Sequence, residues 1–169
     1  MFYTATFNQI RYMNKYILPL SICSGEPSWY HDYKDRSYCF FDKRGVYNGL
    51  VAWPLVLDPK TVKKIEDQGA MCRKNCPFDT HNCLFKSLYA LQLKNTSIYK
   101  ILSDLEDIKE TYRKLAKIKD HENIDICFMV YEQPTNPCSE REVIKEYFES
   151  NNIRIEEWSC DNFNKITLF

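Results

Sequence analysis

The chain is poor in glycine, which makes up only 4 of its 169 residues. Glycine-rich phosphate loops such as G-x-G-x-x-G need several glycines close together, because the backbone must approach the phosphates closely. Gly25, Gly45, Gly49 and Gly69 fit neither this pattern nor that of a Walker loop. The sequence therefore excludes a nucleotide site of the glycine-rich type.

Net charge and long apolar runs are also absent. Lys and Arg total 23 and Asp and Glu total 23, so no broad basic field favours nucleic acid. No apolar stretch approaches the ~20 residues that a membrane span needs. The beginning, "MFYTATFNQIRYMNK", contains polar residues throughout, unlike a signal peptide. We therefore predict a cytoplasmic protein without a nucleic-acid or membrane partner, and the composition leaves its oligomeric state open.

The balance of residue types that is present is ordinary for a soluble globular protein, with 44% hydrophobic and 27% charged residues. The length predicts a single domain over residues 1–169. Apolar pattern and turn signals predict strands and helices that alternate along the chain. We expect strands at about 2–7, within 15–23, at 124–131 and at 153–158, and helices from "DPKT" (58–61), over 83–93, over 97–119 and at about 139–150.

The run "IDICFMVY" (124–131) is apolar without alternation, as is typical of a parallel strand covered on both faces. The predicted fold is therefore an α/β, three-layer, Rossmann-like domain with a mostly parallel sheet and a cysteine-bearing loop insertion. Within 97–119, apolar residues recur at spacings of three and four and predict one buried stripe. Its members are Ile98, Ile101, Leu102, Leu105, Ile108, Tyr112 and Leu115, and the shorter helix should bury Leu84, Leu88 and Leu91.

The segment "NPCSER" (136–141) lies where a predicted strand has ended and a helix begins. Unpaired backbone N–H groups at a helix start attract anions. Ser139 could donate a hydrogen bond there, Arg141 could pair with a phosphate or carboxylate, and the same field would lower the pKa of Cys138. The alternative is purely structural: Ser139 caps the helix together with Glu142, Arg141 pairs with a nearby acid, and Cys138 is an inert thiol.

Segments 7–11, 21–30 and 132–141 should meet at the carboxyl edge of the sheet, where open α/β sheets bind their ligands. Arginines in these segments would hold phosphates, and hydroxyl groups would form hydrogen bonds. Aromatic rings could stack on a base. Glu132 could accept a hydrogen bond from a ribose hydroxyl or a base amine. The predicted ligand-binding residues are Arg11, Ser21, Ser24, Trp29, Tyr30, Glu132, Ser139 and Arg141. This set favours a small anionic, nucleotide-like ligand, although Trp29 could equally be a packing residue.

The stretch "ICFMVYEQPTNPCSEREVIKEYF" (126–148) resembles the C-terminal signature of the family called domain of unknown function 488. In that family a hydrophobic strand ends in Glu, and a short loop leads to Cys-His-Arg or Cys-Ser-Glu-Arg at a helix start. "YTATFNQIRYM" and "PLSICSGEPSWY" resemble its first two strands and their turns, and "CP" with Cys83 is similar to a cysteine-bearing branch. The resemblance implies a compact α/β domain with a polar pocket at the carboxyl edge. Ser139 and Glu140 stand where many members have His, so it implies no histidine-based mechanism.

Eight cysteines are many for a chain of this length. Without a signal peptide, metal binding or reactive thiols become more plausible than disulfides. "CRKNCPFDTHNC" offers Cys72, Cys76, His81 and Cys83 as tetrahedral zinc ligands. Distant cysteines could replace His81 as the fourth ligand, namely Cys39, Cys23 or Cys160. An iron–sulfur cluster is the weaker alternative, and free thiols remain open; Cys127, in the middle of a strand, should belong to the core.

Two functions remain open from the sequence. The first is a binding module that holds a small anionic or nucleotide-like ligand without turnover. Low glycine and abundant Lys, Asn and Tyr are typical of AT-rich bacteria and their phages, so a phage anti-defence protein that sequesters or senses a nucleotide signal fits this composition. The second is an enzyme with Cys138 as nucleophile on a nucleotide or phosphorylated substrate, in which Glu132 or Glu140 would be the base.

Overall fold

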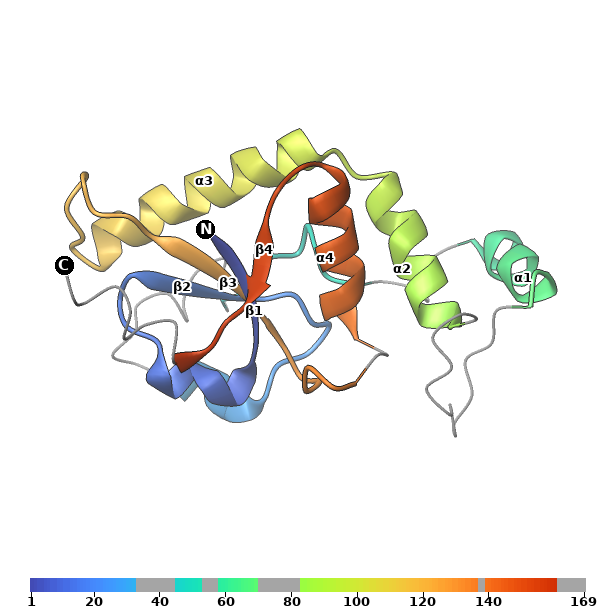
Figure 1. Ribbon diagram of the computed structural model, residues 1–169, viewed down its shortest axis with the longest axis horizontal. Helices are drawn as coiled ribbons and strands as arrows, with labels where there is room; N and C mark the ends of the chain where they lie inside the picture. The colour runs from blue at the N-terminus through green and yellow to red at the C-terminus, as the bar shows by residue number, and fades with distance from the viewer. Residues whose placement is uncertain (33–44, 53–57, 70–82, 137–138, 161–169) are drawn as a thin grey trace.

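The computed structural model describes residues 1–32, 45–52, 58–69, 83–136 and 139–160 (Figure 1). The strands are β1 (Phe2–Thr6), β2 (Ile17–Ser21), β3 (Asp125–Val130) and β4 (Ile155–Glu157). The α-helices are α1 (Pro59–Asp67), α2 (Leu84–Lys94), α3 (Ile98–Leu115) and α4 (Glu140–Ser150). Two 3₁₀ helices, η1 (Phe7–Tyr12) and η2 (Ser28–Asp32), follow β1 and β2. The sequence predicted the strands and α-helices to within a few residues, and it missed both 3₁₀ helices.

The four strands form a parallel sheet in the order β2-β3-β1-β4. In the register, Phe2 of β1 lies beside Ile126 of β3 and Ile155 of β4. Residues 126–130 of β3 are all buried, because this strand lies inside the sheet and is covered on both faces. This confirms the interpretation of the apolar run without alternation.

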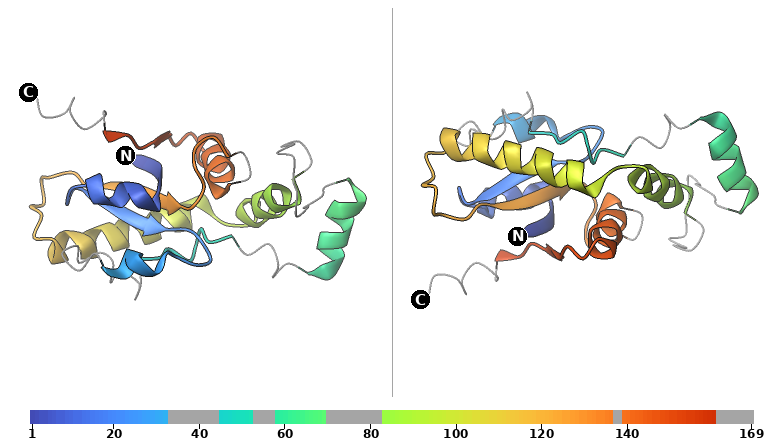
Figure 2. Two further views of the ribbon diagram at one scale, coloured as in Figure 1. Left: turned by 90° about the horizontal axis from the view of Figure 1, so that it is seen from below. Right: turned by 90° about the horizontal axis from the view of Figure 1, so that it is seen from above.

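Helices cover both faces of this sheet. Figures 1 and 2 show α3 and α4 on one side of it and η1 and η2 on the other. Phe128 of β3 packs edge-on against Phe148 of α4, with ring centroids 5.5 Å apart, and Phe2 contacts both rings. On the opposite face Phe7 of η1 packs edge-on against Tyr30 of η2 at 5.1 Å. The α/β, three-layer, Rossmann-like prediction is confirmed.

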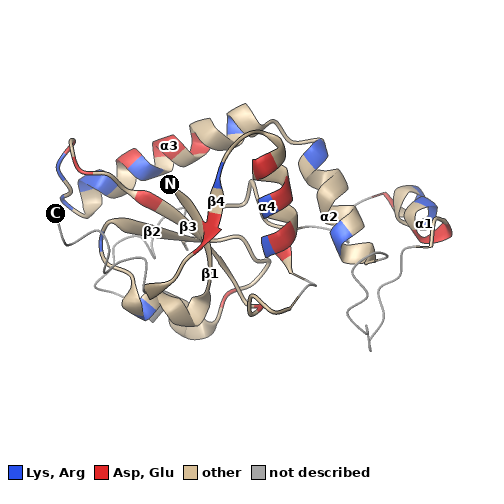
Figure 3. Ribbon diagram, viewed as in Figure 1, with Lys and Arg blue, Asp and Glu red and all other residues tan. Residues whose placement is uncertain are grey.

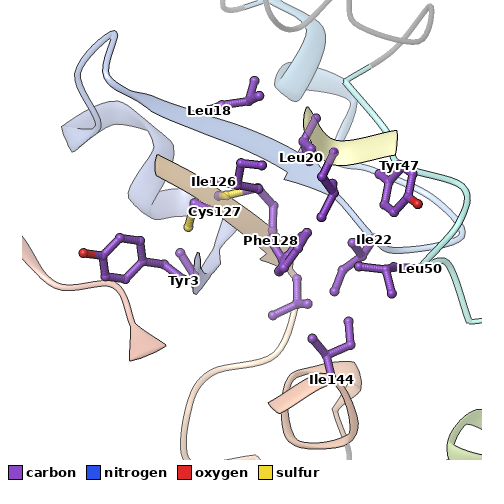
Figure 4. Packing of buried hydrophobic residues seen from close by; sticks show 14 of the residues in the cluster. Tyr3, Leu18, Leu20, Ile22, Tyr47, Leu50, Ile126, Cys127, Phe128 and Ile144 are labelled. Atoms are coloured by element: carbon purple, nitrogen blue, oxygen red, sulfur yellow. The ribbon is translucent and has the colours of Figure 1, made fainter. Parts of the chain in front are cut away.

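The core is made largely of aliphatic and aromatic side chains from the sheet and from the helices on its two sides. Leu18 and Leu20 of β2, Ile126 and Phe128 of β3, and Ile144 of α4 lie close together in Figure 4 and are almost fully buried. Burying such side chains stabilises the fold by about 1.5–3 kcal/mol each. Cys127 is also fully buried, as predicted for a mid-strand position, and burial raises the pKa of its thiol.

The long helix α3 begins at Ser97, whose hydroxyl accepts a hydrogen bond from the backbone N–H of Lys100 at 3.5 Å. Ile101, Leu105 and Tyr112 are buried, as the predicted stripe requires. The prediction is wrong for Leu115, which is 52% exposed. This residue is the last of α3, and the core contacts at this end come from Tyr112, Ala116 and Ile118 instead.

In α2 the buried residues are Leu88, Tyr89 and Leu93, whereas the predicted Leu84 and Leu91 are only partly covered. The aromatic ring is drawn inward because the Tyr89 hydroxyl donates to the carbonyl of Leu50 at 2.5 Å. The helix also packs against α4. The contacts of α2 with Leu50 and with α4 therefore determine which face is buried, and the spacing of its leucines does not.

Charged residues occur along all four α-helices (Figure 3), and most of them are at least partly exposed. On α3, Lys100 pairs with Asp104 at 3.0 Å and Lys109 pairs with Glu106 at 2.5 Å. In the part of the chain that the structure describes, no helix is long and apolar enough to cross a membrane.

Candidate functional site

The carboxyl ends of β1, β2 and β3 lie at one edge of the sheet, because the three strands are parallel and adjacent. Each is followed at once by irregular or 3₁₀ structure: η1 after β1, residues 22–27 after β2, and residues 131–136 after β3. The structure therefore brings together the three segments that the sequence predicted to converge. This carboxyl edge is where ligands bind in open α/β sheets.

Arg141 lies in the first turn of α4, and only 7% of its side chain is exposed. Its Nη1 pairs with the carboxylate of Glu157 in β4, and its Nη2 donates to the backbone carbonyl of Glu132 at 2.8 Å. Nε is buried and has no hydrogen-bond partner among the described residues. The guanidinium is thus directed into the protein, as the structural alternative from the sequence required, and an incoming phosphate would compete with Glu157 for it.

Ser139 caps α4. Its hydroxyl accepts from the backbone N–H of Arg141 at 3.2 Å, and the residue is fully buried. The reciprocal half of a capping box is missing from the described contacts of α4, because the Glu142 carboxylate instead pairs with Lys86 of α2. Ser139 therefore stabilises the helix start, and its hydroxyl faces away from solvent.

The carboxyl groups of Glu132 and Glu140 lie close enough at this edge to interact electrostatically. Glu132 follows β3, and Glu140 is the first residue of α4; both are partly exposed. Burial, together with the negative charge of Glu132, raises the pKa of Glu140 from 4.5 to about 7. Two neighbouring carboxylates cannot both ionise easily, so Glu140 keeps its proton to a higher pH than an isolated glutamate does.

Cys23 lies beside this pair, in the turn after β2. Its Sγ is directed toward the carbonyl oxygen of Met129 at 3.7 Å. Burial and the neighbouring carboxylates of Glu140, Glu132 and Glu26 raise the pKa of the Cys23 thiol strongly. The thiol therefore stays protonated, and the edge near it is electrically negative.

The remaining predicted ligand-binding residues are more scattered. Ser21 is buried and accepts from the N–H of Cys23 at 3.3 Å, whereas Ser24 is exposed. The Tyr30 ring is fully buried, and its hydroxyl donates to the carbonyl of Gly45 at 3.0 Å, so this ring is a core residue. Trp29 is half-buried and packs against the core, in accord with the packing interpretation. Arg11 is exposed, and its Nε donates to the carbonyl of Asn8 at 2.9 Å.

Several predicted residues lie outside the described residues, namely Cys138, Cys72, Cys76, His81 and Cys39. Cys83 is described and is buried at the position preceding α2. Within the described ranges no group of three or more His, Cys, Asp or Glu side chains forms a metal site. Because most of the predicted ligands fall elsewhere, the zinc site stays a prediction.

Sequence reasoning named Glu132 and Glu140 singly but did not predict that they contact each other. It considered Cys23 only as a possible metal ligand, and it missed Glu157 as a member of this region. Glu132 and Glu140 are separated by a loop whose closure sequence patterns do not encode. A usable signal was the presence of acidic residues both at a strand end and at the following helix start, since these two positions lie at one edge in a parallel sheet.

Comparison with models of known protein families finds none that matches this chain, and no curated protein or solved structure matches it either. The resemblance to the domain-of-unknown-function family therefore stays a prediction.

Proposed function

We propose that the carboxyl edge of the sheet binds a small nucleotide-like ligand, and that the Glu132–Glu140 pair is its principal contact. The observation that carries this proposal is the juxtaposition of two acidic side chains without a basic partner among the described ion pairs. Buried charges are ordinarily compensated, and perturbed carboxyls gather at functional sites. The partial exposure of both residues leaves them within reach of a ligand.

The chemistry of the pair favours the hydrogen-bond donors of such a ligand. Ionised carboxylates only accept, so they suit base amines and ribose hydroxyls. Glu26 and the strongly raised pKa of Cys23 indicate that this part of the edge repels anions. A phosphate would therefore lie away from the pair, toward Arg11 or the amino end of α4, because Arg141 is engaged by Glu157.

The first experiment is native mass spectrometry of the purified protein before and after denaturation. A released mass of nucleotide size supports the proposal, and the same spectrum reports any bound zinc. Calorimetric titration with AMP, GMP, CMP and UMP then gives affinities for defined probes. Neither a co-purified small molecule nor binding of any of the four at millimolar concentration would contradict the proposal.

Matched variants locate the site. Glu132→Gln should weaken binding of the best probe by about tenfold or more, since hydrogen bonds to charged groups contribute about 1.5–3 kcal/mol. Glu146→Gln, an exposed change on the same helix, should leave the affinity unchanged. Equal affinities for these two variants would place the ligand elsewhere.

Binding should also depend on pH. Donor groups on the ligand favour the ionised form of Glu140, so ligand binding releases the proton of the Glu140 carboxyl to solvent. Affinity for the best probe should therefore rise as the pH increases through about 7, the pKa of Glu140, and Glu140→Gln should abolish this dependence. A flat pH profile for the unmodified protein would contradict a direct contact with Glu140.

A second candidate function is catalysis, and one observation favours it. A carboxyl group with a pKa of about 7 is suited to general acid–base work at neutral pH. Glu140 would then be the acid–base residue and Cys138 the nucleophile on a nucleotide or phosphorylated substrate. Turnover that is lost in both Cys138→Ala and Glu140→Gln, with binding of the substrate retained, would support the enzyme; a bound ligand recovered intact after long incubation would support the binding module.

A further inference from the structure

The guanidinium of Arg141 connects the two backbone segments that carry the carboxyl pair. Its Nη2 donates to the carbonyl oxygen of Glu132 at 2.8 Å, two residues beyond the end of β3. Arg141 itself directly follows Glu140 in the first turn of α4. One buried side chain therefore holds the main chain at Glu132 against the helix turn that begins with Glu140.

Glu157 and Thr4 hold Arg141 in turn. The Glu157 carboxylate pairs with Nη1, and its Oε2 accepts from the Thr4 hydroxyl at 2.8 Å. Thr4 lies in β1 and is buried, and its carbonyl accepts from the N–H of Trp158 at 2.9 Å. The guanidinium is thus anchored on two strands of the sheet, β1 and β4, while it holds the loop after β3.

We propose that Arg141 is the positioning residue of the Glu132–Glu140 pair, and that Glu157 and Thr4 orient its guanidinium for this role. This inference rests on the proposed function, because it concerns the same site. Arginine suits the task since its planar group can form several hydrogen bonds of fixed direction, which a lysine ammonium cannot reproduce. A buried ion pair contributes little net stability compared with apolar packing, so its value here lies in the geometry that it imposes.

The test is a carboxyl titration of Glu140 by NMR in three network variants. Arg141→Gln removes a positive charge, and the charge effect alone would raise the pKa of Glu140; Glu157→Gln removes a negative charge, and the charge effect alone would lower it. If positioning dominates, both variants separate the pair and lower the pKa of Glu140 by about one unit or more from about 7. A pKa of Glu140 that moves in opposite directions in the two variants would overturn the inference.

Thr4→Val provides the charge-neutral version of the same test. It keeps a β-branched side chain in β1 but removes the hydroxyl that holds Glu157. The inference requires a lowered pKa of Glu140 here as well, and an unchanged value would contradict it. Glu156→Gln is the matched control in β4, because Glu156 pairs with Arg154 instead and should leave the titration unchanged. Should Arg141→Gln fail to fold, Thr4→Val still decides the outcome, because it changes no charge.

This titration needs no ligand, so the inference and the proposed function can fail separately. A pKa of Glu140 that falls in all three variants, with no nucleotide bound, would support Arg141 as the positioning residue while contradicting the proposed function. Nucleotide binding that Glu132→Gln weakens, with a pKa of Glu140 insensitive to the three variants, would overturn the inference and leave the function standing.

Discussion

Two glutamates near the start of α4 lie in opposite environments. Glu157 is partly buried, and it faces the guanidinium of Arg141 and the hydroxyl of Thr4. Glu140 is also partly buried, but it faces a second carboxyl, that of Glu132. The first arrangement compensates a buried charge, and the second leaves one uncompensated. The comparison separates a contact that maintains the structure from one whose cost is more readily explained by function.

Removal of Arg141 should have the largest effect. Arg141→Ala leaves Glu157 without its cation and should lower the free energy of unfolding by about 3 kcal/mol, the lower end of the range for breaking a buried ion pair, because Glu157 keeps some contact with water. Denaturation in urea measures this change. Arg154→Ala is the control: its side chain is 80% exposed and pairs with Glu156, so its loss should be below about 1 kcal/mol. Equal losses in the two variants would remove the distinction between buried and surface pairs.

The Glu132–Glu140 pair should make the free energy of unfolding depend on pH. The pKa of Glu140 is raised on folding from 4.5 to about 7, so the folded state binds the proton more tightly. This contribution to stability is complete below pH 4.5 and is lost as the pH rises through about 7. We expect a loss of about 2–3 kcal/mol across this window, since each unit corresponds to about 1.4 kcal/mol and partial exposure reduces the effect.

Unfolding free energies measured from pH 4.5 to pH 8 check this expectation. Glu140→Gln should lose the decrease over this window and should be more stable than the unmodified protein at pH 8, because it removes the charge that is repelled there. Glu149→Gln, an exposed change near the other end of α4, should keep the decrease. The same pH dependence in all three proteins would show that another group titrates.

The smallest effect should come from the helix caps, which extend the comparison to α3. Ser139 is fully buried and accepts from a backbone N–H at 3.2 Å, whereas Ser97 is exposed and accepts at 3.5 Å. Ser139→Ala should lower the free energy of unfolding by about 1 kcal/mol, and Ser97→Ala by about 0.5 kcal/mol. Thermal or urea unfolding distinguishes them. A larger loss for Ser97→Ala would mean that burial of the cap does not strengthen it.

Local patterns predicted much of the fold. The apolar run of β3, the "DPKT" start of α1 and the beginning of the long helix α3 all lie within a residue or so of where the sequence placed them. The 3₁₀ helix η1 was missed because it depends on a distant contact: Gln9, which accepts from the N–H of Thr6, also donates to the carbonyl of Trp158 at 3.2 Å. Periodicity failed at Leu115 because spacings of three and four allow either Leu115 or Ala116 to follow Tyr112, and Ala116 is the one that packs against the core.

The convergence of three segments at one sheet edge follows from the order of strands and helices along the chain, because parallel strands place their carboxyl ends together. The partners of individual side chains at that edge were decided by the tertiary structure. Arg141 is engaged by Glu157 because β4 returns beside β1. Glu140 lies near Glu132 because Arg141 of α4 donates to the carbonyl of Glu132 after β3. Periodicity and capping are short-range properties that a sequence displays directly, whereas the partner of a charge depends on which distant strand the folded sheet brings beside it.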